Sequence, residues 1–499
     1  MIKDLRNTLK QTFIYGLSNI AIKAAGLILL PFYTGSLSVS EYGELAILEI
    51  FAQFFVGVIS LQIPSAVLRF GSETKSPDEL RKIYSTALLS AGAFVMVFAL
   101  IALPFTGHLS ELIFSSQVFK IHITLVIFSI ASEVLGLLPL QLLRLKEQSI
   151  QYLLFIAFKL SVLLGLVWYF VVFKDEKVLG AVKAILATNL IFLAATLPLQ
   201  FKNSSLQFNK NYGVRMYRYG APLVFTTISA VLLTISDRLI LKIYGEFTDV
   251  GIYTLAYKIG SLSNLLIIAS FSLGFLPIAF KKLEDPDFKP FFSKTLTLYI
   301  ALTILLTLGI SVFGYELTKL LSSGEEAYWV AAILVPFIAF LFIFKALNNY
   351  FSYIFLLTKK TKYHAKITVI GVFANILLNF VLVPTYGMYG AVAATGLSYL
   401  SMAIMTHYLA NKQMKIGYEY KRISLLMLSS AIVIAMALLV NGYSLAIRGS
   451  VKILLMLIYV FFLYRIVATT SERNRLNKVL NLLKSRKGIV KLINESKIS

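Results

Sequence analysis

Residues 328–357 read YWVAAILVPFIAFLFIFKALNNYFSYIFLL, a run of thirty residues that carries one charged side chain, Lys345. The hydrocarbon core of a bilayer is about 30 Å thick and needs about 20 apolar residues in a helix. This stretch therefore predicts a transmembrane helix. The whole chain has the same character, because 58% of its 499 residues are hydrophobic and its mean hydropathy is +0.80. These values exclude a soluble globular enzyme.

Fourteen apolar stretches of this kind can be placed along the chain, with only short loops between them. We therefore predict an all-α polytopic membrane protein with about 14 transmembrane helices and no large soluble domain. The predicted spans are residues 12–34, 44–68, 83–106, 118–143, 150–173, 178–200, 219–243, 252–280, 291–314, 328–357, 363–385, 388–411, 423–441 and 447–468.

The formal charge of +23, from 47 basic and 24 acidic residues, is a pattern also seen in nucleic-acid-binding proteins. Here the lysines and arginines gather at the N-terminus, in every second loop and in the tail from Arg473 to Lys497, with Lys174 and Lys177 as the clearest exceptions. Cytoplasmic loops of membrane proteins carry this excess. The distribution predicts that both termini are cytoplasmic, and we expect no nucleic-acid partner.

An internal repeat divides the chain. Tyr15-Gly16 recurs as Tyr219-Gly220, and Gly180-Ala-Val182 recurs as Gly390-Ala-Val392, at offsets of 204 and 210 residues. Each half holds six spans, so the two halves have the same orientation and are related by an axis along the membrane normal, a transporter layout. We predict two pseudo-symmetric six-helix lobes and two C-terminal helices. The predicted units are residues 1–205, residues 206–412, two additional helices in 413–470 and a basic cytoplasmic tail in 471–499.

Motifs for catalysis are missing from the sequence. There is no phosphate-binding P-loop, zinc-protease motif, nucleophile elbow or dinucleotide fingerprint. The absence of cysteine excludes thiolate catalysis and cysteine metal sites. We expect a transporter without enzymatic activity, metal or cofactor.

The informative residues are charged groups within the predicted spans. At a lipid-facing helix centre each would cost about 2.5–3.5 kcal/mol, so most must face one another, water or the bundle interior. Five cations stand against three anions, which favours a large, anionic, amphipathic substrate. The eight residues are Lys23, Glu49, Glu133, Lys159, Asp237, Arg238, Lys258 and Lys345.

Polar residues at helical spacing accompany these charges and are candidates to line a hydrated cavity. The candidates are Asn19, Gln53, Asn264, Asn349 and Asn375. Structural roles stay open for many of these residues. Asparagines often form interhelical hydrogen bonds, Glu49 is placed to snorkel at the outer interface, Glu133 and Lys159 are a candidate pair, and Arg238 is expected to bond across helices.

Five short motifs carry a family resemblance: Thr12-Phe-Ile-Tyr-Gly16, Leu30-Pro-Phe-Tyr33, Ser40-Glu-Tyr-Gly43, Ser236-Asp-Arg-Leu-Ile240 and Val250-Gly-Ile-Tyr253. In this order, over roughly residues 8–410, the chain resembles the polysaccharide exporters of the multidrug/oligosaccharidyl-lipid/polysaccharide flippase superfamily, the Wzx-type O-antigen flippases. The resemblance implies translocation of an undecaprenyl-diphosphate-linked oligosaccharide across the bacterial inner (cytoplasmic) membrane by alternating access. The product would be lipopolysaccharide O-antigen, capsule or a related polysaccharide.

The resemblance also assigns roles to the charged residues. The cations of the central cavity would bind the diphosphate, and the carboxylates would couple transport to H⁺ or Na⁺. The last two helices would form a groove for the lipid tail, and a role beside other polysaccharide assembly proteins stays open. The substrate-binding candidates are Lys23, Arg238, Lys258, Lys345 and Lys159, and the coupling candidates are Asp237, Glu133 and Glu49.

Two other functions stay open. A multidrug or cation exporter of the same superfamily would share the repeat, but the interior lysines argue against it. A membrane polysaccharide polymerase or ligase would use the same lipid-linked substrate, but such enzymes have a long outer loop and lack the twofold repeat.

Overall fold

The computed structural model of the protein describes residues 24–74, 76–205 and 207–467, together with Ile14, Ser18 and Ala21. Regular secondary structure in this part of the chain is helical throughout. Twelve of its helices are long and apolar enough to cross a membrane. The prediction of an all-α polytopic membrane protein is confirmed, whereas the count of 14 spans is not. Most of the first predicted span lies outside the described residues, and its end, Ala24–Thr34, is a shorter apolar helix.

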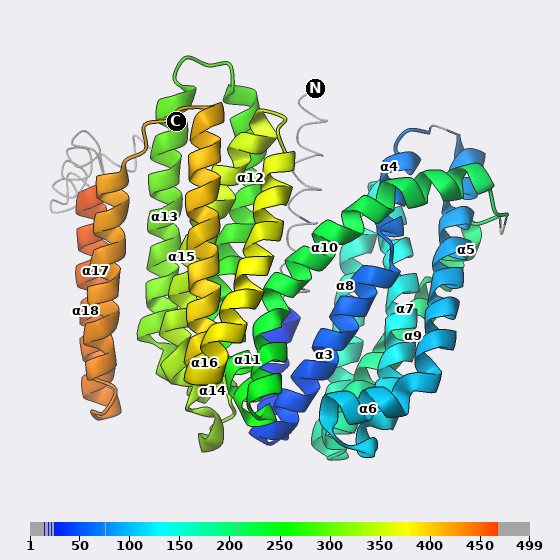
Figure 1. Ribbon diagram of the computed structural model, residues 1–499, viewed down its shortest axis with the longest axis horizontal. Coiled ribbons are helices and arrows are strands. Elements are labelled where there is room, and N and C mark those ends of the chain that lie inside the picture. The colour runs from blue at the N-terminus through cyan, green and yellow to red at the C-terminus, as the bar shows by residue number, and fades with distance from the viewer. Residues whose placement is uncertain are drawn as a thin grey trace, which may run out of the picture.

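The N-terminal half forms one helical bundle, to the right in Figure 1. Its helices are α2 (Leu30–Thr34), α3 (Val39–Ile59), α4 (Ile63–Gly71), α5 (Pro77–Ala102), α6 (Thr106–Phe114), α7 (Lys120–Leu145), α8 (Ser149–Val167) and α9 (Lys177–Lys202). We call this bundle lobe one.

The following helices, α10 to α16, form a second bundle, which we call lobe two. Helix α10 crosses obliquely from lobe one into it (Figure 1). The helices are α10 (Lys210–Tyr244), α11 (Phe247–Gly260), α12 (Ala269–Lys282), α13 (Phe288–Val312), α14 (Gly314–Leu321), α15 (Ala331–Leu357) and α16 (Lys362–Gln413). The last pair, α17 (Tyr420–Leu439) and α18 (Leu445–Val467), stands outside lobe two and packs against α13.

The predicted span 44–68 is two helices, because the chain bends between α3 and α4. Leu61 and Gln62 adopt left-handed φ angles of 43° and 53°, and Pro64 starts the next helix. Gly220 of α10 crosses this bend so closely that a Cβ there would lie 2.1 Å from the carbonyl oxygen of Leu61. The bend therefore lets α10 pass over the end of α3.

Helix α16 contains two of the predicted spans, 363–385 and 388–411. Gly387 interrupts it with a non-helical φ of 54° and ψ of −131°. A Cβ on Gly390 would lie 2.3 Å from the carbonyl oxygen of Leu382, although eight residues of straight helix span about 12 Å. The chain therefore folds back on itself at Gly387, and α16 is a tight pair of helices.

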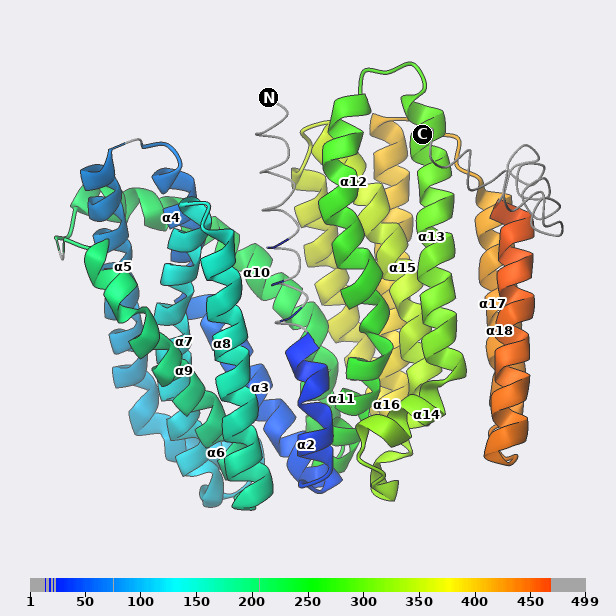
Figure 2. The same cartoon turned by 180° about the vertical axis from the view of Figure 1, so that it is seen from behind.

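The two lobes meet at one end of the molecule and splay apart at the other (Figures 1 and 2). The closed end holds the α2–α3 turn, the α10–α11 turn and α14. Lobe-to-lobe hydrogen bonds there run from Ser323 Oγ to Pro31 O at 2.7 Å and from Tyr328 OH to Leu37 O at 3.0 Å. The open end holds the basic loops that the positive-inside rule assigns to the cytoplasm. Under that predicted orientation the molecule opens inward.

Two glycines make the closed end possible. Gly43 of α3 and Gly251 of α11 are 208 positions apart, the spacing of the sequence repeat. A Cβ on Gly43 would lie 1.9 Å from the carbonyl oxygen of Phe247, and one on Gly251 would lie 2.1 Å from that of Val39. Small residues let membrane helices approach backbone to backbone, so equivalent glycines of the two halves form the contact between the lobes.

Gly43→Val is expected to open this end. The valine must push α3 and α11 apart, and overpacking of this kind costs about 1–3 kcal/mol. Because the chain has no cysteine, a single Thr34→Cys, buried at the closed end, reports the change. We expect it to react with a membrane-impermeant maleimide about tenfold faster in the Gly43→Val background. Gly92→Val, where a Cβ meets nothing within 4 Å, is the control, and equal rates in both would contradict the prediction.

Candidate functional site

An ion pair between α3 and α11 joins the two lobes. Lys258 Nζ of α11 lies 3.5 Å from Glu49 Oε2 of α3, and it also lies 5.3 Å from the centre of the Tyr42 ring. The side chains of Lys258 and Glu49 remain 23% and 35% exposed. The Glu49 carboxylate thus faces a cation of the other lobe, a partner that the interpretation of Glu49 as a snorkelling residue at the outer interface did not include.

A cavity of about 230 Å³ opens beside Lys258. Ser261 and Asn264 line it with Lys258, and Gly26 and Leu27 close it from the end of the first predicted span. Helix α11 ends at Gly260 and a π-helical turn begins at Asn264, so the backbone here is irregular. An ammonium, a hydroxyl and an amide form a donor set that suits phosphate oxygens.

Arg238 and Lys345 lie on either side of a group of aromatic rings in lobe two. The Arg238 guanidinium carbon is 4.4 Å from the Tyr257 ring centre, and Lys345 Nζ is 5.3 Å from that of Phe342. The Tyr257 and Phe342 rings themselves pack edge to face at 5.8 Å. Burial of Arg238 is nearly complete, at 6% exposed, so its guanidinium is fixed by packing as well as by charge.

Arg238 also bonds to the neighbouring helix, as expected. Its Nε donates to Thr254 Oγ1 of α11 at 3.1 Å, and one terminal nitrogen donates to the carbonyl of Thr234 at 2.7 Å. These contacts leave Arg238 outside the residues that line the cavity beside Lys258.

Asp237 is the centre of a separate, fully buried polar cluster between α10, α11 and α16. Its Oδ2 accepts hydrogen bonds from the Tyr253 hydroxyl and, at 3.4 Å, from Thr395 Oγ1. The side-chain amide of Asn375 donates to Thr395 Oγ1 at 3.2 Å, and its side-chain oxygen Oδ1 accepts from the Ser236 hydroxyl at 2.6 Å. Asn375 therefore makes interhelical hydrogen bonds in the interior of lobe two, away from the cavity beside Lys258.

Two acceptor oxygens in this cluster have no hydrogen-bond partner among the residues that the structure describes. They are Asp237 Oδ1 and the side-chain oxygen of Asn379, whose amide donates to the carbonyl of Asn375 at 2.9 Å. Unsatisfied buried acceptors are costly, and a proton or a small cation would satisfy them. Within the described ranges no three acidic or histidine side chains gather as a metal site, so the acceptors are one carboxylate with amide and hydroxyl oxygens.

The remaining candidates lie apart from these groups. Lys159 of α8 lies 5.3 Å from the Phe192 ring centre, and the described part of the chain shows no ion pair between it and Glu133, which is half-buried on α7. Gln53 is exposed on α3, and Asn349 is half-buried on α15. The remaining two candidates, Lys23 and Asn19, lie outside the described residues.

Sequence reasoning missed a charged cluster at the closed end. Glu316 of α14 forms an ion pair with Arg448, whose Nε lies 2.8 Å from its carboxylate, and accepts a hydrogen bond from Lys452 Nζ at 2.9 Å; both cations are on α18. The Lys452 side chain is only 1% exposed and that of Arg448 is 10% exposed. The two cations are four residues apart in the last helix, which was a usable signal. This cluster fastens the C-terminal helix pair to lobe two.

Glu316→Gln is expected to destabilise the protein, because it leaves two nearly buried cations without their anion. Removing one partner of a buried pair typically costs about 3–5 kcal/mol. Thermal unfolding of the purified protein in detergent should show a clearly lower midpoint than the wild type. Glu325→Gln, in the exposed loop after α14, is the matched control. Equal midpoints for the two variants would show that the Glu316 cluster contributes no stability.

Comparison with known proteins gives consistent matches. The model of the family "Polysaccharide biosynthesis protein" matches residues 8–282, and that of "Lipid II flippase MurJ" matches residues 156–462. The probable low-salt glycan biosynthesis flippase Agl15 of Haloferax volcanii is 25% identical over 235 residues, 46% of this chain and 47% of that protein. The chain thus spans about half the length of that relative.

A second relative and a solved structure extend over more of the chain. The capsular polysaccharide biosynthesis protein CapF of Staphylococcus aureus is 25% identical over 378 residues, which cover 73% of this chain and 87% of CapF. The structure of lipid II flippase MurJ in an inward closed conformation superposes with a TM-score of 0.71 at 14% identity, over 93% of this chain and 99% of that one. The fold is that of MurJ.

Proposed function

Because the chain belongs to the polysaccharide biosynthesis protein family, a family of polysaccharide flippases, we propose that it translocates an undecaprenyl-diphosphate-linked oligosaccharide across the bacterial inner membrane. The transport runs from the inner to the outer leaflet and supplies O-antigen, capsule or a related polysaccharide. Both termini are cytoplasmic in this proposal, which the basic loops at the open end support.

The observation that carries the proposal is Lys258, beside a cavity and paired with Glu49 of the other lobe at 3.5 Å. A diphosphate that enters from the open end replaces Glu49 as the partner of Lys258, and Ser261 and Asn264 donate further hydrogen bonds. Losing its cation frees Glu49 from lobe two. Binding of the substrate headgroup thereby weakens the contact that holds the lobes together at the closed end.

The lipid tail has a separate path in this proposal. An apolar cavity of about 670 Å³ lies between α15, α16 and α17, with Phe337, Phe340, Tyr389, Ile434 and Leu438 among its walls. A polyprenyl chain gains free energy from apolar contact and needs no polar partner there. This cavity supports the role of the C-terminal helices as a groove for the tail.

Asp237 is the proposed coupling site. Its unpartnered Oδ1 and that of Asn379 are acceptors for H⁺ or Na⁺. The residues around them belong to three helices, so occupation changes the packing of α10 against α16. The membrane potential acts in the same direction as transport, because each negative charge moved outward gains about 2.3 kcal/mol per 100 mV.

Rocking of the lobes about their contact then exposes the site to the outer side. The proposal is tested with the full chain in proteoliposomes that contain a fluorescent lipid-linked oligosaccharide. Protection of the sugar from an added glycosidase reports its leaflet. We expect flipping of the diphosphate-linked form and little flipping of the same oligosaccharide on a neutral lipid. Equal rates for both lipids would overturn the cationic site, and export of organic cations instead would favour a multidrug exporter.

A further inference from the structure

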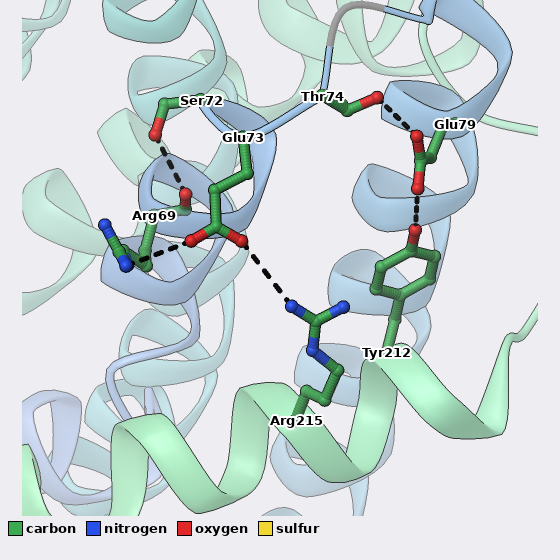
Figure 3. A network of polar contacts seen from close by, with 7 residues as sticks. All are labelled: Arg69, Ser72, Glu73, Thr74, Glu79, Tyr212 and Arg215. Atoms are coloured by element: carbon green, nitrogen blue, oxygen red, sulfur yellow. Dashed lines mark hydrogen bonds and ion pairs between the residues drawn. The ribbon is translucent and has the colours of Figure 1, made fainter.

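The first half of α10 lies across the ends of α4 and α5, and Figure 3 shows how one of its faces is held there. The Tyr212 hydroxyl donates to the Glu79 carboxylate, and an Arg215 nitrogen lies 3.5 Å from Glu73 Oε2. The Arg215 guanidinium also stacks 4.6 Å from the Phe70 ring centre. These contacts fix which way the helix is turned, and therefore what its other face presents.

That other face combines cations with exposed apolar groups. Lys210, Val214, Tyr217 and Arg218 follow the spacing of one helix face, and all four are exposed. Tyr217 is 55% exposed and the preceding Phe208 is 58% exposed. Among the described residues, neither Lys210 nor Arg218 has an ion-pair partner. Basic and aromatic residues on one face are typical of a helix that lies in a membrane interface.

Beneath this face lies a cavity of about 530 Å³ that the proposed transport cycle does not use. Its walls are apolar, from Leu61 at the α3–α4 bend and Leu89, Ala93 and Phe94 of α5, and Lys210 and Arg218 stand at its rim. One turn along α5 from Phe94, the Phe98 ring packs against Phe55 of α3 with ring centres 5.1 Å apart. The cavity is thus an apolar wedge with a cationic mouth.

We propose that this wedge binds an anionic phospholipid, with the phosphate held between Lys210 and Arg218 and an acyl chain between α3 and α5. The charge of the mouth selects the headgroup, since basic groups between membrane helices on the cytoplasmic side attract anionic lipids. The apolar walls select the chain. A soluble anion would use the two cations but not the walls, so lipid is the occupant that both parts of the cavity fit.

The test uses the cysteine-free full chain in nanodiscs. A bimane fluorophore on Val97→Cys, exposed on α5 one turn beyond Ala93, is quenched by lipids with brominated acyl chains. We expect brominated phosphatidylglycerol to quench at a lower mole fraction than brominated phosphatidylcholine. A reporter on Leu302→Cys, exposed on α13 of lobe two, should show no such preference. Equal quenching by the two lipids at Val97→Cys would overturn the proposal.

Variants then separate the two parts of the site. Lys210→Gln with Arg218→Gln should lose a preference of about thirtyfold, from about 1 kcal/mol for each cation. Lys281→Gln with Lys289→Gln, exposed cations at the same end of lobe two, should keep it. Ala93→Trp fills the wedge and should reduce quenching by both lipids, whereas Leu100→Trp, 66% exposed on α5, should not. A preference that survives the Lys210 and Arg218 changes would contradict the assigned phosphate position.

Discussion

Lys258→Glu is expected to abolish translocation of the lipid-linked oligosaccharide while the protein still reaches the membrane. The change places a second carboxylate beside Glu49 and removes the cation that the diphosphate needs. Truncating one partner of a buried charge pair costs about 2–5 kcal/mol in binding. Because this pair is only partly buried, the lower end of that range applies, and flipping in proteoliposomes should fall by about thirtyfold. Lys258→Arg, which keeps the charge and its reach, should retain most of the activity.

Exchanging the two charges separates substrate binding from a purely structural role. Glu49→Lys combined with Lys258→Glu restores an ion pair between α3 and α11, and we expect it to restore thermal stability relative to Lys258→Glu alone. Transport should stay lost, because the cation has moved away from Ser261 and Asn264. Full recovery of flipping in the exchanged protein would mean that Lys258 only holds the lobes together.

Asp237→Asn is expected to uncouple transport from its driving ion. The asparagine is nearly the same shape and can still accept from Tyr253 and Thr395, so the fold should persist. The asparagine amide cannot take up a proton at the pH of the assay, and it attracts a cation far less than a carboxylate does. In proteoliposomes with an imposed Na⁺ or pH gradient, the gradient-dependent part of flipping should disappear. Binding of substrate near Lys258 should change little.

Glu133→Gln is the matched control for that prediction. Glu133 is a carboxylate within another membrane span, outside the Glu49–Lys258 pair, and it is half-buried on α7. We expect Glu133→Gln to keep the dependence on the gradient. The reverse outcome, with dependence lost only in Glu133→Gln, would move the coupling site to lobe one. Imposing the two gradients separately identifies the ion.

Much of the architecture could be predicted because the bilayer imposes a length on each apolar run. The structure departs from the predicted spans where the local backbone conformation sets the direction of the chain. The bend at Leu61 and Gln62 and the reversal at Gly387 depend on left-handed residues, which a hydropathy pattern does not register. The contact of Gly43 with Gly251 depends on the packing of two segments far apart in the chain, and the repeated motifs of the sequence had not paired these two glycines.

The sequence indicated which charged residues belong to the candidate site better than it indicated which of them contact one another. The cost of a charge in lipid correctly indicated that Lys258, Arg238 and Asp237 lie in the interior, but it named no partners. Glu49 and Lys258 are 209 residues apart, so only the folded lobes bring them together. Tyr253 ends the motif Val250-Gly-Ile-Tyr253, but nothing in the sequence indicated that its hydroxyl, or that of Thr395, donates to Asp237.

The most direct test of the central claim is the leaflet on which the lipid-linked oligosaccharide accumulates in a strain that lacks the gene. Spheroplasts and inverted membrane vesicles from that strain can be treated with a glycosidase that does not cross the membrane. If the protein is a flippase, the oligosaccharide collects on the cytoplasmic leaflet and is cleaved only in inverted vesicles. If it is instead cleaved in spheroplasts, it has already crossed, and the protein acts after translocation, as a polymerase or ligase would.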